Sequence, residues 1–227
     1  MSNVVRATLA DQAYRELRSR ILSGQLAGGQ RLLPEELAVE LAISPTPIKE
    51  ALLRLEADGL VVSPLRKGAV VRRFTLQDVN ELYEARLMIE HDALGKAFAR
   101  GQITPAFVEA LNRTLEQHAL YADRNTLDDL TTALAFDREF HQQLVLAAGN
   151  GLVGEWHLRI LGQTHTVFVY NAGDYRSSVS EHRAVVDAIA HGSLKDARKA
   201  LEDHLKHSWK NTLSHVERSM KNEEIGA

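Results

Sequence analysis

The sequence predicts a mostly α-helical protein with two domains, a small mixed domain over residues 1–74 and an all-α domain over residues 75–227. Apolar residues recur at helical spacing along most of the chain, and β-rich runs occur only at 60–63 and 69–72. The 227 residues are enough to bury two cores. The charge also divides the chain, because residues 1–74 hold 11 Lys or Arg against 8 Asp or Glu (+3), and the rest hold 16 against 22 (−6).

Composition excludes several classes of protein. The chain has no cysteine, which excludes disulfides and thiolate metal sites and is compatible with a reducing compartment. No apolar run approaches the roughly 18 residues of a membrane span, and the N-terminal MSNVVRATLA lacks the apolar core of a signal peptide. We therefore expect a soluble, cytoplasmic protein with no membrane partner.

The basic first domain begins with three predicted helices. Residues 9–23 have helical periodicity, which the glycine-rich SGQLAGGQ ends. A second, short helix begins at Pro34, and a third runs from the N-cap Ser44, with Pro45 in its first turn, to Gly59. The last two helices, joined by a tight turn, predict a helix-turn-helix.

A predicted hairpin follows the helix-turn-helix. The β-rich runs at 60–63 and 69–72 are separated by a turn that carries Arg66, Lys67 and Gly68. This hairpin is a wing, and two cations at its tip suit phosphates or a minor groove.

The solvent-facing side of the third helix offers a second nucleic-acid surface. It presents Thr46, Lys49 and Arg54 to a major groove. A bare helix-turn-helix pattern fits a small helical bundle with a solvated hairpin equally well. The basic wing at the right distance favours double-stranded DNA as the partner.

The stretch LLPEELAVELAISPTPIKEALLRLEADGLV, followed by PLRKGAVV, resembles the winged-helix DNA-binding domain of the GntR family of bacterial transcription regulators, over roughly residues 9–74. The resemblance implies DNA contacts at the wing around Arg66 to Gly68 and at Glu35, Ser44, Pro45, Thr46 and Lys49. Pro45 and Lys49 stand where the family usually has arginine, and Glu35 often replaces a basic residue. Lysine lacks the planar fork with which arginine reads guanine, so the family's usual operator sequence is not carried over.

The second domain shows only helical periodicity. Breaks near Gly101, Asn125, 149–151, Gly173 and Gly192 divide it into six helices, which predicts an all-α six-helix bundle. The predicted helix starts are Thr75 with Asp78, Thr104 before Pro105, Ser178 with Glu181, and Ser193 with Asp196.

Polar side chains interrupt the apolar stripes of three of these helices. In LTTALAFDREFHQQLVLAAG, residues 130–149, Asp137 and His141 occupy positions where the stripe requires apolar residues, and His182 and His204 do the same in two later helices. Burying one such group alone costs a few kcal/mol. The alternative for each histidine is a core residue hydrogen-bonded to a carbonyl.

Together the four residues can satisfy one another through a divalent metal ion. Asp137 and His141 lie at i and i+4 on one helix face, and bundle interiors commonly build metal sites from facing helices. Three imidazoles and one carboxylate suit Zn²⁺, Ni²⁺, Mn²⁺ or Fe²⁺. Five other histidines belong to no comparable group of four residues, and we interpret them as surface or incidental residues: His118, His157, His191, His207 and His215.

Arg86 also lies on a predicted inward stripe, with Val79, Leu82, Ile89 and Ala93. An inward guanidinium beside a metal ion leaves surplus positive charge, which an organic acid could neutralise. An i,i+4 ion pair between Arg86 and Glu90 is the alternative.

The segments DREFH, SEHRAVVDAI and ALEDHL resemble the effector domain of the FadR-like branch of the GntR family, of the FCD type and six-helix subtype, over roughly residues 75–220. In many members the matching Asp and three His bind a divalent metal, and arginine is frequent at the place of Arg86. The resemblance implies a homodimer, an organic-acid effector such as a sugar acid or dicarboxylate, and release or rearrangement of DNA when that effector binds.

We therefore expect a homodimeric transcription regulator, a repressor that binds a palindromic operator, and not an enzyme. A metal-dependent hydrolase remains an alternative, although neither Glu90 nor Glu139 is a convincing general base. A regulator that senses the metal itself, or one whose metal is only structural, is also open.

Overall fold

The computed structural model describes residues 8–22, 25–64, 68–123, 126–170 and 176–225. The chain divides into two compact units, Met1–Phe74 and Thr75–Ala227. Within the described residues, no helix combines the length and apolar character needed to span a bilayer.

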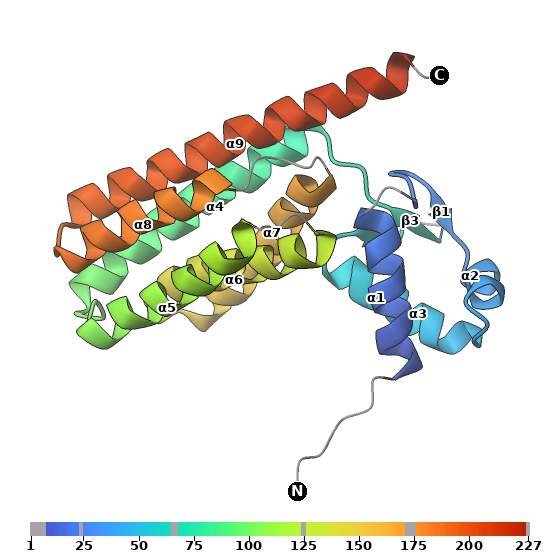
Figure 1. Ribbon diagram of the computed structural model, residues 1–227, viewed down its shortest axis with the longest axis horizontal. Coiled ribbons are helices and arrows are strands. Elements are labelled where there is room, and N and C mark those ends of the chain that lie inside the picture. The colour runs from blue at the N-terminus through green and yellow to red at the C-terminus, as the bar shows by residue number, and fades with distance from the viewer. Residues whose placement is uncertain (1–7, 23–24, 65–67, 124–125, 171–175, 226–227) are drawn as a thin grey trace, which may run out of the picture. The chain divides into compact units, whose positions relative to one another are not determined.

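The first unit is a winged helix-turn-helix (Figure 1). Its elements are α1 (Leu9–Leu22), β1 (Arg31–Leu32), α2 (Pro34–Glu40), α3 (Pro45–Ala57), β2 (Val61–Val62) and β3 (Ala69–Val71). The strands form an antiparallel sheet in the order β1-β3-β2. Sequence analysis missed β1, because a strand of two residues has no alternating pattern and depends on its pairing with Val70 and Ala69.

The core of this unit lies mainly between α1 and α3. Leu17, Ile21, Ile48 and Leu55 are fully buried there. Ser44 occupies the predicted N-cap of α3 with an extended backbone, but its side chain makes no capping hydrogen bond. Pro47 at the third position accounts for part of this, because it lacks the N–H to which an N-cap side chain commonly bonds.

The second unit contains six helices in its described residues: α4 (Leu76–Ala99), α5 (Pro105–Ala122), α6 (Leu127–Leu146), α7 (Gly151–Tyr170), α8 (Arg176–Ala190) and α9 (Leu194–Ile225). Thr75 and Asp78 form the predicted capping box of α4, and the Thr104 and Ser193 hydroxyls accept from the backbone N–H groups of Phe107 and Asp196. The predicted start at Ser178 is wrong. The helix begins earlier, and Ser178 is a buried residue inside it.

The helices pack as neighbouring pairs, with α9 lying along both α4 and α8 (Figure 1). Apolar side chains from five helices form one core cluster, which includes Leu94, Leu115, Phe140, Val186 and Leu201. Polar groups of α4, α6, α7, α8 and α9 are buried in the same bundle, and they form the candidate site.

Candidate metal centre and anion site

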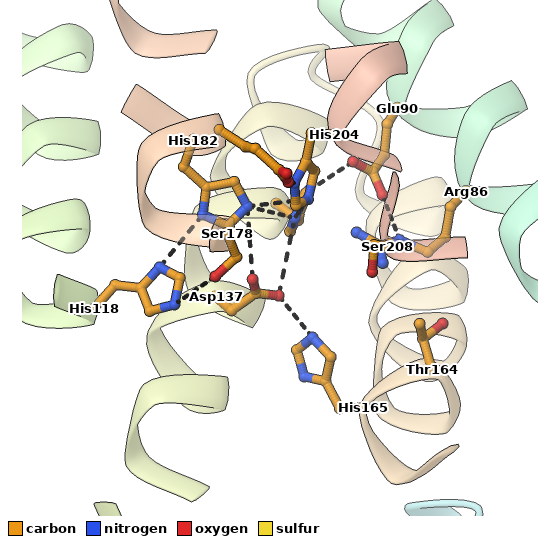
Figure 2. Close-up of polar contacts among 12 residues, drawn as sticks. Arg86, Glu90, His118, Asp137, Thr164, His165, Ser178, His182, His204 and Ser208 are labelled. Carbon is orange, nitrogen blue, oxygen red and sulfur yellow. Dashed lines mark hydrogen bonds and ion pairs between the residues drawn. The ribbon is translucent and has the colours of Figure 1, made fainter. Parts of the chain in front are cut away.

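Three of the four predicted metal ligands meet at their Nε2 atoms. Those of His141 on α6, His182 on α8 and His204 on α9 are 3.1–3.2 Å apart in every pair. Asp137 lies one turn from His141, and its Oδ1 is 3.6 Å from the His182 Nε2 while its Oδ2 is 3.9 Å from the His141 Nε2. All four side chains are buried, and Figure 2 shows Asp137, His182 and His204 directed toward one another.

Local structure explains why helices distant in sequence bring these groups together. The i,i+4 spacing places Asp137 and His141 on the same face of α6. A short turn joins α8 to α9, and in it Gly192 adopts a φ of 73°, a conformation that glycine permits without strain. The resulting α8–α9 hairpin brings His182 beside His204.

Hydrogen bonds to carboxylates determine where two of the imidazoles carry their protons. His141 Nδ1 donates to Glu90 Oε2 and His204 Nδ1 donates to Glu181 Oε2, each at 2.7 Å. An ionised carboxylate only accepts, so a ring that is neutral at either position carries its proton on Nδ1. Both Nε2 atoms then present lone pairs to each other.

This arrangement passes a physical test for a metal site. Burial lowers the pKa of His141 to about 4 and holds that of His182 well below its usual value, so both rings are neutral at pH 7. Facing lone pairs repel, whereas a divalent cation between them would be attracted by both. Ligand nitrogens about 2.0–2.1 Å from one ion lie roughly 3.0–3.4 Å from each other, which matches the spacing here.

Asp137 is ionised in this setting. Burial alone would raise the pKa of its carboxyl group, but the hydrogen bond from His165 and the surrounding imidazoles hold that pKa well below its usual value. The His165 Nε2 donates to Asp137 Oδ2 at 2.7 Å. The site therefore offers one carboxylate and three imidazoles, a donor set that suits a transition-metal or zinc ion.

Two histidines that were predicted to be surface or incidental residues are fully buried. His118 on α5 has its Nδ1 3.3 Å from the His182 Nδ1, and its Nε2 is 3.4 Å from the Ser178 hydroxyl. His118, Asp137 and His182 thus form a second group with the spacing of metal ligands. His157 on α7 donates from Nε2 to Glu90 Oε1 at 3.0 Å.

The interpretation was wrong because both histidines continue a buried face of their helices, α5 and α7. His118 follows Leu111 and Leu115 on one buried face, and His157, Leu161 and His165 recur at intervals of four. His165, which the sequence analysis did not single out, shares this signal. The prediction is correct for His191 and His207, which are exposed.

Arg86 is buried, with 2% of its surface exposed, as its place on the inward stripe predicts. Its Nε donates to Glu90 Oε1 at 2.8 Å, which is the i,i+4 ion pair. Its Nη2, also buried, has no hydrogen-bond partner among the described residues. A buried charged donor left unsatisfied is costly, which favours an anion that binds there.

Arg86 lines a small cavity beside the candidate metal ligands. Asp137, His204, Tyr83 and Ser208 also line it. Its volume of ≈ 30 Å³ is room for roughly two water molecules.

Glu90, the ion-pair partner of Arg86, has a lowered pKa. Burial alone would raise the pKa of this carboxyl group, but the charge of Arg86 and the hydrogen bonds from His141 and His157 hold that pKa well below its usual value.

The predicted DNA-binding residues of the first unit differ in their availability. Ser44, Thr46 and Lys49 are exposed, and Pro45 is partly buried. The Lys49 Nζ lies 3.7 Å from the Glu35 Oε1 at the start of α2. Gly68 is exposed with a φ of 71°, whereas Arg66 and Lys67 lie outside the described residues.

Arg54 is exposed on α3, as predicted, and it also has partners on α1. Its Nη1 donates to Asp11 Oδ1 at 2.6 Å, and its guanidinium lies 4.3 Å over the ring of Tyr14. Tyr14 in turn donates to Asp58 at 2.5 Å. Arg54 therefore links α3 to α1. Its contacts with Asp11 and Tyr14 compete with any contact between the guanidinium and DNA.

Comparisons with known proteins agree for both units. Residues 9–71 match the family model "Bacterial regulatory proteins, gntR family", and residues 81–207 match the FCD domain. The chain is 26% identical over 208 residues to an HTH-type transcriptional regulator, YdhC, of Bacillus subtilis (strain 168), covering 90% of this chain and 91% of that one. It is 27% identical over 192 residues to the gluconate operon transcriptional repressor of Bacillus licheniformis, covering 81% and 76%.

The solved structure of E. coli McbR/YncC has the same fold. It aligns with a TM-score of 0.68 at 18% identity, covering 95% of this chain and 100% of that one. The matched domains and the named relatives are regulators of transcription and not enzymes. The chain accordingly belongs to the GntR family of bacterial transcription regulators and carries an FCD domain as its C-terminal unit.

Proposed function

We propose that this regulator is a homodimeric repressor that binds a palindromic operator and releases it in response to a small organic acid, which is held beside a divalent metal ion in the FCD domain. The observation that carries the proposal is the 3.2 Å approach of the Nε2 atoms of His141 and His204 beside the ionised Asp137. A related repressor of the gluconate operon supports the sign of regulation.

Asp137, His141, His182 and His204 would hold the ion. Three imidazoles and one carboxylate suit Zn²⁺, Ni²⁺, Mn²⁺ or Fe²⁺. The ion would supply a positive charge and open coordination positions for an acid's oxygen atoms. His165 fixes the Asp137 carboxylate, so its orientation does not depend on the ion.

Arg86 would bind the effector's carboxylate through Nη2, which faces no other acceptor among the described residues. The remaining cavity is small, so short-chain acids fit this arrangement better than long ones. The acid can shift the equilibrium between DNA-bound and free protein only if it binds the two forms with different affinities.

The first unit would read DNA through Ser44, Pro45, Thr46 and Lys49, and through the wing at Arg66, Lys67 and Gly68. The exposure of Ser44, Thr46 and Lys49 supports this surface. Arg54 is omitted because its guanidinium is held by Asp11 and Tyr14. As a protein that acts on DNA, the regulator would work in the cytoplasm.

A thermal-shift screen tests the proposal. Acetate, glycolate, malate, citrate and gluconate are each added to the Zn²⁺-loaded and to the chelated protein. We expect at least one acid to raise the melting temperature only with metal present, and the same acid to release the protein from its operator in a gel shift. Stabilisation by an acid that is equal with and without metal would contradict the metal-assisted site.

A further inference from the structure

Glu90 is a buried carboxylate shared by several donors. It is fully buried at the middle of α4, and three side chains from three helices donate to it. Oε2 accepts from His141 Nδ1 at 2.7 Å, and Oε1 accepts from Arg86 Nε at 2.8 Å and from His157 Nε2 at 3.0 Å. Figure 2 shows Glu90 between Arg86 and the histidine cluster.

The contact with His141 decides which ring nitrogen is available to a metal. A neutral imidazole has one proton and can carry it on either nitrogen. If the proton were on Nε2, it would point at the Nε2 atoms of His182 and His204 and occupy the ligand position. The Glu90 carboxylate accepts a hydrogen bond from His141 Nδ1 and holds the ring proton on that nitrogen. The Nε2 lone pair of His141 then faces the Nε2 atoms of His182 and His204.

The contact with Arg86 decides which guanidinium nitrogen is available to an anion. Glu90 accepts a hydrogen bond from Arg86 Nε, and Arg86 Nη2 is buried without a hydrogen-bond partner among the described residues. The same carboxylate therefore prepares an acceptor position at His141 and a donor position at Arg86. A lone i,i+4 ion pair would explain only the second contact.

We propose that Glu90 is a positioning residue that fixes the proton of His141 on Nδ1 and turns the guanidinium of Arg86, so that one carboxylate prepares both the metal site and the acid site. This inference rests on the proposed function for the identity of the two sites. Its first consequence, the tautomer of His141, does not require any bound metal.

The tautomer is measured on the metal-free wild-type protein by long-range ¹H–¹⁵N correlation spectra of the histidine rings, with the His141 signals assigned by their loss in His141→Gln. We expect His141 to carry its proton on Nδ1. A proton on Nε2 would overturn the proposal, whether or not the protein binds metal.

The variant Glu90→Gln tests the link to metal affinity. The side-chain amide has nearly the same shape, but its N–H₂ group donates, and toward His141 Nδ1 it would draw the ring proton to Nε2. We expect the His141 signals to change tautomer and the affinity for Zn²⁺ to fall about 10–100-fold in a chelator competition, as for other outer partners of metal ligands. Unchanged affinity in a folded Glu90→Gln protein would overturn the proposal.

One matched variant separates this role from the simple loss of a negative charge. Glu109→Gln makes the same change at an exposed i,i+4 pair with Arg113, and we expect wild-type affinity for Zn²⁺. If Glu90→Gln does not fold, the wild-type tautomer still decides. A wild-type protein with the Nδ1 proton that takes up no Zn²⁺ would contradict the proposed metal function and leave the Glu90–His141 assignment standing.

Discussion

The Nε2 atoms of His141 and His204 lie 3.2 Å apart, although each ring directs its Nδ1 proton at a different glutamate. Where both rings are neutral, two lone pairs this close raise the free energy of the metal-free folded state. A cation between them would remove that cost and gain two ligands, so binding and folding of the bundle should be linked.

Metal removal should therefore destabilise the protein. At a free Zn²⁺ concentration about 100 times the Kd, mass action adds about 2.7 kcal/mol to the free energy of unfolding. For a unit of this size that is a rise in melting temperature of about 5–10 °C, which a chelator should reverse. Differential scanning fluorimetry measures it, and His141→Ala should lose the response while the exposed His191→Ala keeps it. An equal response in both variants would place the ion elsewhere.

Arg86→Lys should separate the acid from the metal. A lysine can keep the ion pair with Glu90, but it has no second nitrogen corresponding to Nη2. We expect the affinity for a responsive acid to fall at least about tenfold, since a charge-assisted hydrogen bond is lost, and the affinity for Zn²⁺ to change little. Isothermal titration of each ligand gives both values. A matched loss of both affinities would show that Arg86 only supports the bundle.

The sequence predicted the elements of the fold well, because the periodicity of apolar residues is local. Caps such as Thr75 with Asp78 follow from a few neighbouring residues. The strand β1 could not be predicted, because two residues acquire their conformation only by pairing with β3. The local pattern of residues therefore predicts the helices. The strand β1 depends on tertiary pairing and is not predicted by it.

The candidate site was predicted in part for the same reason. His141, His182 and His204 each interrupt an apolar stripe, and that signal placed them in the interior correctly. The hydrogen-bond partners of these histidines could not be predicted from the same local pattern. Nothing local to Glu90 indicates a contact with His141, which is 51 residues away, so the tautomers emerged only with the structure.

Lys49 and Arg54 should respond differently to substitution. Lys49 is exposed beside Glu35 and available to a phosphate or base, whereas the guanidinium of Arg54 is held between Asp11 and Tyr14. Lys49→Ala should weaken operator binding and reduce the slope of log affinity against log salt by about 1. Arg54→Ala should leave that slope unchanged and lower the stability of the winged helix. Fluorescence anisotropy at several salt concentrations, with thermal denaturation of each variant, compares them; a reduced slope in Arg54→Ala would return Arg54 to the reading surface.

The turn of the helix-turn-helix contains a strained residue whose relief should stabilise the protein. Ala42 has a φ of 55°, in the left-handed region where a Cβ costs about 1–2 kcal/mol. Ala42→Gly removes that cost but adds flexibility to the unfolded chain, so we expect the free energy of unfolding to rise by about 0.5–1 kcal/mol. Chemical denaturation of the purified protein measures the change. Ala57→Gly is the matched control, because Ala57 is also exposed but helical, and the same substitution there should lower stability by about 0.5–1 kcal/mol. Equal destabilisation by the two substitutions would mean that the turn relaxes around Ala42 and stores no strain.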